Sequence, residues 1–454
     1  MQNSSAKILN YNKDARSIVA SAARMSTQQG TALDIYARSG DPEKDLKLIG
    51  KVLSSGHKSV IEHQTFSIAL NDVSVLVEQF VIEFRLASFT VKSRRYVDFS
   101  DAGYVVPSGL SVEGEKQYRG DMNALFQDYQ QLLSIGIPKE DARFLLPYCL
   151  RSNFFMTLDA RELIHMICSM THGRGARFEE LRQLGASLKA QFEQAYPGVI
   201  DAEEARYAGT AEETLPDVIQ DAAEYVGSAQ IIGAPADAES LLETAMAFAG
   251  RFQAKGGRDL CPENMRALLN DLRPRELEAL NYTFGISDIS LACLTHFTRH
   301  RIQSPVIPSV LRALAGGHYV MPQSVRENAD AEAIYRQAFA RQAVAARRMQ
   351  EMGVPAEVLA YYAMSGHQLD FLMTLNAREL LHFAKLRTCT RAQWEIRQVA
   401  RKMLQELNAQ SPSIFSGFGP SCAVTGRCPE GKMTCGNPVE IVDGIWRRAH
   451  PEQE

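Results

Sequence analysis

The sequence predicts an α+β protein made of two homologous halves. Three observations support this fold class. Similar segments recur in the same order at nearly one spacing, two short stretches alternate apolar and polar residues as strands do, and one long stretch has the apolar spacing of a helix. We therefore expect each half to contain a small sheet with long helices.

The repeat is visible in three pairs of segments. FFMTLDARELIHM at residue 154 matches FLMTLNARELLHF at residue 371, an offset of 371 − 154 = 217. NDVSVLVEQFVIEFR at residue 71 matches SDISLACLTHFTRHR at residue 287, an offset of 287 − 71 = 216. A third pair, DARSIVASAARM and DAESLLETAMAF, lies near the start of each half. Two copies of a whole domain favour a fused dimer over a solenoid.

The domain boundary is expected near the acidic stretch Asp201–Asp217, which is charged and poor in large apolar residues, as a linker or exposed helix would be. We predict an N-terminal domain over 1–222 and a C-terminal domain over 223–454, the second with a cysteine-containing tail at 419–438. Strands are predicted at HQTFSIAL (63–70) and LNYTFGIS (280–287). A helix is predicted over 373–407, before the breaker run NAQSPSIFSGFGP.

Composition narrows the class of protein. The 454 residues are 45% hydrophobic and 22% charged, with a formal net charge of −4, which argues against a general nucleic-acid or membrane-surface binder. The sequence has no apolar run long enough to span a membrane, and its start lacks the pattern of a secretory signal. Five of the eight cysteines are scattered, so a disulfide framework is not expected. We expect a cytoplasmic protein.

Against this mildly acidic background, two basic clusters stand out. The triplet Arg299-His300-Arg301 directly precedes an apolar, proline-broken segment. The matching triplet of the first half is Glu83-Phe84-Arg85, and the basic residues there come later, in SRRY at 93–96. Guanidinium groups bind phosphates, whereas a carboxylate repels them. A solvated charge cluster is the alternative for the triplet at 299–301. For Arg85 and Arg94 the alternative is a role as ordinary surface or ion-pair arginines.

These motifs resemble those of the flavin-dependent thymidylate synthases. RHRIQSPVIPS resembles the family signature RHRxxSxNxxSxR, and NARELLHFAKLR with AQWEIR (376–397) resembles the family's C-terminal helix. GHKSVIEHQTF (56–66) resembles its N-terminal histidine-bearing region. In that family a homotetramer builds each active site from more than one subunit. The resemblance therefore implies a homodimer of fused chains, and the net charge argues against a nucleic-acid or membrane partner.

The two halves depart from the family pattern in opposite ways. The second half keeps the RHR triplet but has Val306 and Leu311 where the family has asparagine and arginine. Ala360 replaces the arginine that the first half keeps as Arg143. In turn, the first half has Asp159 and Met170 where the second half keeps Asn376 and Arg387. We expect one composite site per chain, with its mirror image lost.

The resemblance also implies residue roles and an activity. FAD would relay a carbon unit from methylenetetrahydrofolate and hydride from NADPH to dUMP, giving dTMP; the protein would supply orientation and electrostatics. The implied catalytic residues are Arg387, Arg95 and His63. The implied nucleotide-binding residues are Ser93, Arg95, Arg143, Arg387 and Arg299. The implied flavin-binding residues are His63, Arg299, His300, Arg301, Asn376, Arg378 and His382.

Two other interpretations of the whole chain stay open. One is a flavin enzyme that acts on another pyrimidine nucleotide, such as a hydroxymethylase. The other is a non-catalytic protein that binds flavin or nucleotide. For His165 and His382, which share a repeat position, a shared structural role is an alternative to ligand binding.

The tail has three cysteines with the spacing C-x5-C-x6-C, at Cys422, Cys428 and Cys435. With Cys389 as a fourth ligand, these thiolates could bind a structural zinc ion. An iron–sulfur cluster and free buried thiols are the alternatives.

Overall fold

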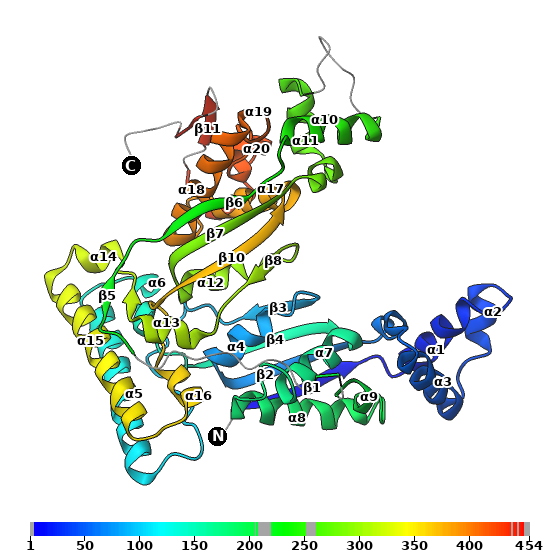
Figure 1. Ribbon diagram of the computed structural model, residues 1–454, viewed down its shortest axis with the longest axis horizontal. Helices are drawn as coiled ribbons and strands as arrows, with labels where there is room; N and C mark the ends of the chain where they lie inside the picture. Colours follow the sequence, from blue (N-terminus) through cyan, green and yellow to red (C-terminus); the bar gives the residue numbers. More distant parts are fainter. Residues whose placement is uncertain are drawn as a thin grey trace. The chain divides into compact units, whose positions relative to one another are not determined.

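The computed structural model describes residues 4–204, 206–207, 219–250, 260–436, 439–442 and 445–448 (Figure 1). It divides into two compact units. The first comprises Met1–Ala222, Leu314–Gly317 and Met321–Ser365, and the second Ala223–Ala313, His318–Val320 and Gly366–Glu454. The chain passes from the first unit to the second at Ala222–Ala223, but residues 321–365 of the second sequence half pack with the first unit. Most of the expected linker lies outside the described residues, apart from the short helix α9 (Asp201–Glu204) and residues 206–207.

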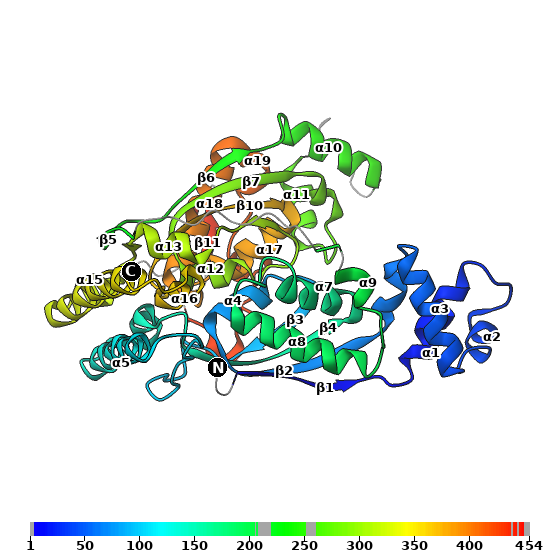
Figure 2. The same cartoon turned by 60° about the horizontal axis from the view of Figure 1, so that its bottom comes forward.

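The first unit is built on an antiparallel sheet with strand order β1-β2-β4-β3. The strands are β1 (Ser5–Tyr11), β2 (Thr65–Ser74), β3 (Ala87–Val91) and β4 (Arg151–Asp159). Alternate residues of β4 are buried, as expected for a sheet with one covered face. Helices α7 (Ala160–Thr171) and α8 (Glu179–Glu193) pack against each other, and Figure 2 shows them over this sheet. Their apolar side chains and those of the strands form one core cluster.

Two long helices complete the first unit. α5 (Val112–Ser134) packs against α15 (Ala329–Glu351), which comes from the second sequence half. Asp121 of α5 is the main polar contact: it accepts hydrogen bonds from Arg348 at 2.9 Å and from the Tyr362 hydroxyl at 3.0 Å. Because Asp121 is buried, these bonds replace the solvation that its carboxylate loses. Besides three helices near the N-terminus, the unit also contains α4 (Val75–Ile82), α6 (Lys139–Ala142), α14 (Gln323–Arg326), α16 (Ala356–Leu359), η1 (Lys58–His63), η2 (Arg143–Leu145) and η4 (Ala360–Tyr362).

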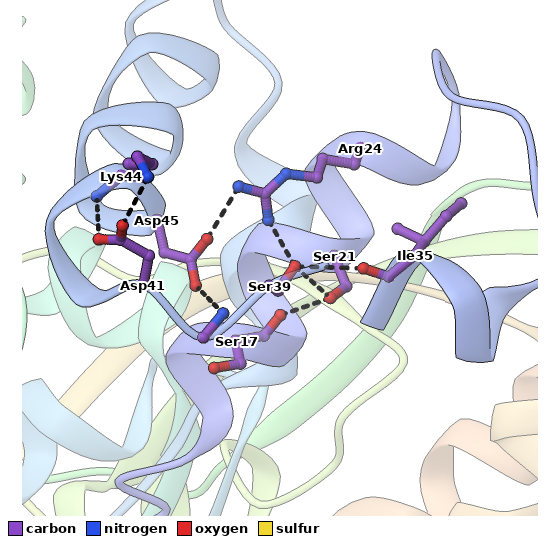
Figure 3. Close-up of polar contacts among 9 residues, drawn as sticks. Ser17, Ser21, Arg24, Ile35, Ser39, Asp41, Lys44 and Asp45 are labelled. Atoms are coloured by element: carbon purple, nitrogen blue, oxygen red, sulfur yellow. Dashed lines mark hydrogen bonds and ion pairs between the residues drawn. The ribbon is translucent and has the colours of Figure 1, made fainter. Parts of the chain in front are cut away.

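Three helices near the N-terminus, α1 (Ala15–Met25), α2 (Ala32–Ala37) and α3 (Pro42–Ser54), are joined by a polar network (Figure 3). The buried carboxylate of Asp45 accepts from Arg24 at 2.9 Å and from the backbone N–H of Gly40 at 2.8 Å. The Ser39 hydroxyl lies between Arg24 and Ser21 and accepts from the Ser21 hydroxyl at 2.9 Å. Asp45 therefore connects α3 both to α1, through Arg24, and to the loop that precedes α3, through Gly40.

The second unit repeats the first sheet. Its strand order is β6-β7-β10-β8, from β6 (Ser228–Gly233), β7 (Asn281–Ser290), β8 (Ser304–Val306) and β10 (Gln368–Asn376). α17 (Ala377–Arg387) and α18 (Trp394–Gln410) take the places of α7 and α8. The remaining elements are α10 (Ala238–Ala249), α11 (Pro262–Asn270), α12 (Leu291–Phe297), α19 (Pro412–Phe415), α20 (Ser421–Thr425), η3 (Arg275–Ala279), η5 (Gly431–Met433), β5 (Ala223–Glu224), β9 (His318–Tyr319), β11 (Val439–Val442) and β12 (Ile445–Arg448). Helix α13 (Val310–Gly316) is divided between the units at Ala313–Leu314.

The duplication extends to a backbone irregularity. Asp72 and Asp288 both have positive φ, 51° and 55°, at equivalent positions where the pairing register shifts. Aspartate tolerates this left-handed conformation better than most residues do. Both sheets therefore have an equivalent bulge, which supports the duplication. The alternation of apolar and polar residues in the sequence does not predict this bulge.

Both predicted strands are confirmed by β2 and β7, but the helix predicted over 373–407 begins too early. Residues 373–376 are the end of β10, and α17 begins at Ala377. Asn376 sets this boundary because its side chain accepts a hydrogen bond from the backbone N–H of Glu379 at 2.9 Å. The chain then leaves the helix at Thr388 and starts α18 at Trp394. Of the helices that the structure describes, none is both long and apolar enough to cross a membrane.

Candidate functional site

In the second unit, the basic triplet follows α12 and presents its members differently. The imidazole of His300 is buried, whereas Arg299 and Arg301 on either side of it are exposed. The chain then enters the short edge strand β8, which pairs with β10 through Ser304 to Val306. The triplet therefore has two exposed arginines on either side of one buried histidine. The alternative of a fully solvated charge cluster does not fit, because all three side chains would then be exposed.

His300 is held by hydrogen bonds at both ring nitrogens. Its Nδ1 lies 2.8 Å from a carboxylate oxygen of Glu379, and its Nε2 lies 3.0 Å from Nε of Arg387. Because arginine can only donate, Nε2 must accept, and the ring proton of a neutral His300 lies on Nδ1, where it is donated to Glu379. Arg387 also donates from Nη2 to the backbone oxygen of His296 at 3.2 Å. The network fixes the orientation of the Arg387 guanidinium.

Helical spacing explains why these groups meet. Glu379, Phe383 and Arg387 lie four residues apart on α17, so they share one face of the helix. The ring of Phe383 is 4.9 Å from that of His300, between the two polar contacts. His382 lies next to this face, with its ring 5.7 Å from His300, and is exposed.

The same cluster could in principle hold a metal ion. Among the described residues, potential ligand atoms lie within 4.8 Å of one another on His300, Glu379 and His382. The hydrogen bonds favour a different role. Glu379 occupies one nitrogen of His300, and the positive charge of Arg387 sits on the other, which opposes a cation there. We interpret the cluster as an arginine-orienting network.

Two further predicted flavin-binding residues have local structural contacts. Asn376 caps α17 through its side-chain oxygen, and Arg378 forms an ion pair with Glu278 of η3. Both lie in the first turn of α17, whereas Arg387 ends the helix. The eleven residues of α17 span about 15 Å, because ten steps of 1.5 Å separate its first and last residues, so the predicted residues extend along the whole helix.

In the first unit, three predicted nucleotide-binding residues come together around Glu140. Arg95 makes a two-pronged ion pair with the Glu140 carboxylate, with nitrogen–oxygen distances of 2.9 and 3.3 Å. The buried Arg143 donates from Nε to the backbone oxygen of Glu140 at 3.0 Å. The Ser93 hydroxyl accepts from the backbone N–H of Arg95 at 3.3 Å. The exposed ring of Tyr96 lies 5.4 Å from the Arg95 guanidinium.

Two acidic residues of these clusters, Glu140 and Glu379, were not predicted. The available signal was spacing: each precedes a predicted arginine on the same short segment, by three residues for Arg143 and by eight for Arg387. Acidic side chains near exposed or half-buried arginines are common in sequences, so that signal is weak.

His63 lies elsewhere in the first unit. It ends η1 and is exposed, and its neighbour Glu62 forms an ion pair with Arg161 at 2.6 Å. Thr65 pairs with Asp159 at one end of β4, whereas Lys92, next to Ser93, bonds to Asn153 near the other end. Six residues of strand separate these two points, about 20 Å at 3.3 Å per residue. Within this unit, the structure therefore does not bring His63 to the Arg95 cluster.

The first unit has lost the histidine network. Phe84 stands where His300 would be, and Met170 stands where Arg387 would be. The ring of Phe84 lies 5.1 Å from that of His165 and 5.6 Å from that of Phe80, so ring contacts stand where the second unit has the hydrogen bonds of His300. Arg94 is confirmed in its ion-pair role, since it binds the buried carboxylate of Glu78 with distances of 2.7 and 3.0 Å. Arg85 donates to the backbone oxygen of Ile82 at 3.2 Å.

The four cysteines proposed as metal ligands lie near the end of the described chain. Cys389 and Cys422 are half-buried, and Cys428 and Cys435 are exposed. By contrast, Cys149, Cys168 and Cys293 are buried in the two units. Burial raises the pKa of the Cys149 and Cys168 thiols to about 12, so these two are held as inert thiols.

The fold and its clusters define a duplicated α+β protein in which each half presents arginines suited to anionic ligands. Comparison with known proteins gives the family. The family model described as "Thymidylate synthase complementing protein" matches residues 7–198 and again 228–413. These matches cover most of the chain, which therefore belongs to this family.

Two relatives carry the name flavin-dependent thymidylate synthase. The one from Geobacter sulfurreducens is 40% identical over 168 residues, which are 36% of this chain and 72% of that protein. The one from Clostridium tetani is 30% identical over 205 residues, which are 40% of this chain and 82% of that protein. Among solved structures, the UMP/dUMP methylase PolB from Streptomyces cacaoi, bound with 5-Br dUMP, aligns with a TM-score of 0.37 and 20% identity, over 46% of this chain and 98% of that chain.

Proposed function

We propose that the chain is an enzyme of the flavin-dependent thymidylate synthase type. It would methylate dUMP to dTMP, with methylenetetrahydrofolate and NADPH as co-substrates and FAD as cofactor. The observation that carries the proposal is the complementary loss between halves. The second half keeps the His300–Arg387 network, which the first half has replaced by apolar side chains, and the first half keeps Arg143, which the second has replaced by Ala360.

The residues present suit FAD. Exposed Arg299 and Arg301 offer paired cations for a diphosphate, and the buried His300 between them holds the segment in place. When bound, the flavin supplies the transfer of the carbon unit and of hydride. Arg387, fixed by His300 and by the backbone oxygen of His296, would direct guanidinium N–H groups at a uracil carbonyl and stabilise charge that develops on the ring.

Nucleotide phosphate binding is assigned to the first unit. Ser93, Arg95 and Arg143 already share one short region there, and Glu140 holds the two arginines in place through its carboxylate and its backbone oxygen. A phosphate would compete with this carboxylate for Arg95. We propose one composite site per fused chain, which combines these residues of the N-terminal half with the Arg299–Arg301 segment of a C-terminal half. We also propose that the working assembly is a homodimer of fused chains.

The test begins with the purified full-length chain and its bound flavin. We expect dTMP, measured by chromatography, only when dUMP, methylenetetrahydrofolate, FAD and NADPH are all present. Arg95→Ala and Arg299→Ala should each reduce product formation by at least about tenfold, the scale of one lost charge-assisted contact. Arg119→Ala, which removes an exposed ion pair with Glu115 on α5, is the matched control.

Three outcomes would contradict the proposal. Flavin-dependent turnover of a different pyrimidine nucleotide, with no dTMP from dUMP, would assign the hydroxymethylase-type alternative. Binding of flavin or nucleotide without any turnover would assign a binding protein. Full activity in either the Arg95 or the Arg299 variant would exclude the composite site.

A further inference from the structure

The first unit contains a cavity of about 350 Å³ that the proposed function does not use. One wall is formed by the end of α3 and by η1, and a second wall by α7. The third wall comes from residues that follow α8, among them Val199, Glu203 and Tyr207. None of the described residues that line the cavity is proposed to bind flavin or nucleotide. Its volume lies within the range of small-molecule sites, about 300–1,000 Å³.

One lining residue is the repeat equivalent of a residue in the histidine network of the second unit. Glu162 precedes Glu379 by 379 − 162 = 217 residues, the offset of the repeat. In the second unit the Glu379 carboxylate is bonded to His300 at 2.8 Å. In the first unit Phe84 stands at the place of His300, and its ring has no N–H to donate. The first unit therefore keeps the carboxylate without the imidazole partner.

The Glu162 carboxylate has acceptor capacity left for a ligand. Its side chain is 11% exposed and has two long contacts: Oε1 accepts from the backbone N–H of Leu86 at 3.3 Å, and Oε2 lies 3.6 Å from Nδ1 of His165. Burial raises the pKa of this carboxyl, but the contacts with His165 and Leu86 outweigh that effect, so the pKa lies below its usual value. The group is therefore charged at neutral pH, and a charged carboxylate can accept about four hydrogen bonds.

The charged side chains of the lining balance one another. Lys58 forms an ion pair with Glu203, and both of them line the cavity. Arg161 also lines it and forms an ion pair with the exposed Glu62. Because both cations already have carboxylate partners, the lining favours an uncharged ligand over a phosphate, which needs cationic donors. A cationic ligand is disfavoured in turn, since it would face two positive side chains.

The rest of the lining suits a flat ring. Apolar side chains come from all three walls, with Leu53 on α3, Ile164 on α7 and Val199 after α8. Two aromatic side chains, His165 and Tyr207, also line the cavity, and their ring centroids are 6.1 Å apart. Apolar walls with a few polar groups are the usual composition of a site for a small organic molecule.

A glycine of α3 leaves space on one side of the cavity. Gly50, Leu53 and Ser54 all line it, and their spacing of three and four residues places them on one face of the helix. A Cβ added to Gly50 would meet no atom of the described structure within 4 Å beyond its own helix backbone and chain neighbours. Glycine is unfavourable inside a helix, so this open space comes with a loss of helix stability. A larger side chain at this position should fill part of the cavity.

We propose that this cavity binds an uncharged planar ring that donates two adjacent N–H groups to Glu162. Guanine and pterins have such an edge, a ring N–H next to an amino group, which matches the two oxygens of one carboxylate. Adenine and cytosine place a ring acceptor next to the amino group, and uracil has carbonyl oxygens on both sides of its N–H. Each of these would set an acceptor against the second carboxylate oxygen. Lys58 and Arg161 offer donors to the ring carbonyl beside the N–H.

The first measurement is isothermal titration calorimetry of the full-length chain with guanosine, which has the required edge and no phosphate. We expect saturable binding at one site per chain. Inosine, which lacks only the amino group, should bind at least about tenfold more weakly, the scale of one lost hydrogen bond to a charged group. Pterin is the second probe, and the tighter of the two ligands identifies the source of the shared edge.

Four variants locate the binding. Gly50→Leu should weaken guanosine binding at least about tenfold by filling the cavity, and it should fold because leucine is the better helix former. Gly120→Leu is the matched control, since Gly120 lies in α5 with similar open space and does not line the cavity. Glu162→Gln should weaken guanosine binding and remove the preference over inosine. Arg95→Ala, at the proposed nucleotide site, should keep guanosine binding.

The proposal fails on any of four results. Wild-type chain that binds neither guanosine nor pterin would overturn it, and so would equal affinity for guanosine and inosine. Unchanged binding in Gly50→Leu would place the ligand outside this cavity. Loss of binding in Arg95→Ala, with Glu162→Gln unaffected, would assign the ligand to the proposed nucleotide site. Because no measurement needs turnover, these results are independent of the test for dTMP formation.

Discussion

Replacing His300 with phenylalanine copies into the second half the residue that the first half already has at this position, Phe84. The ring volume is kept, but both hydrogen bonds of the imidazole are lost. His300 and Glu379 have side chains only 2% and 8% exposed, so water cannot replace the lost partner. Removing one partner of a buried charged pair typically lowers the free energy of unfolding by about 3–5 kcal/mol. The loss here should be smaller, because Glu379 can take up a proton and so avoid leaving a buried, unpaired charge.

We therefore expect His300→Phe to lower the free energy of unfolding of the second unit by about 2–4 kcal/mol, measured by urea denaturation. A double-mutant cycle with Glu379→Gln isolates the interaction between the two side chains, and a coupling of at least about 1 kcal/mol is expected. His382→Phe is the control, since this ring is exposed and lies on the edge of the cluster. A coupling below about 0.5 kcal/mol, or an equal loss in the control, would refute the reasoning.

Three further predictions concern stability. Asp45→Asn should lower the free energy of unfolding by about 1–3 kcal/mol in a urea titration, because it removes the buried charge that binds Arg24. Asp41→Asn is the control: Asp41 is an exposed helix N-cap, and asparagine also caps helices, so the free energy of unfolding should change by less than about 0.5 kcal/mol. Burial lowers the pKa of His367 to about 3, against about 6.5 when unfolded, so the unfolded chain takes up the proton first. Stability should therefore be complete above about pH 6.5 and fall by up to about 1.4 kcal/mol per unit as pH drops towards 3, a slope that His367→Gln should reduce in melting curves between pH 7 and pH 5. Gly317 has φ of 65°, and an added Cβ would lie 2.6 Å from a backbone oxygen, so Gly317→Ala should lower the melting temperature, whereas Gly316→Ala, with open space, should not.

Local patterns in the sequence were sufficient for the fold class. Apolar alternation predicted the strands β2 and β7, and the repeat predicted a small sheet in each half. The equivalent strand orders of the two sheets come from the structure. The same patterns misplaced the start of α17. Met373 and Leu375 have apolar spacing compatible with a helix, but they are buried on one face of β10, and only the capping contact of Asn376 sets the boundary. Periodicity alone cannot separate the two when a strand leads directly into a helix.

The predicted site residues remain a prediction, but the structure shows which polar contacts each of them makes. The family motifs pointed to Arg95, Arg143, His300 and Arg387, and the structure shows that each is part of a defined polar cluster within its unit. The motifs did not reveal that Arg95 is held by a carboxylate. A motif specifies residues that are near in sequence, whereas an ion pair such as Arg95 with Glu140 joins residues 45 apart along the chain.

By itself, the sequence determined that this protein is a duplicated α+β chain of the thymidylate synthase complementing protein family, because repeats and motifs are local properties of residue order. Only the tertiary structure decided that residues 321–365 pack with the first unit. It likewise decided that the segments bearing His63 and the Arg95 cluster meet β4 near its opposite ends, at points about 20 Å apart along the strand. It also decided that Glu379 and His300 together orient Arg387. These contacts form because burial of the apolar faces brings segments together that are distant in the sequence. The spacing of residues along the chain does not predict which of these segments become neighbours.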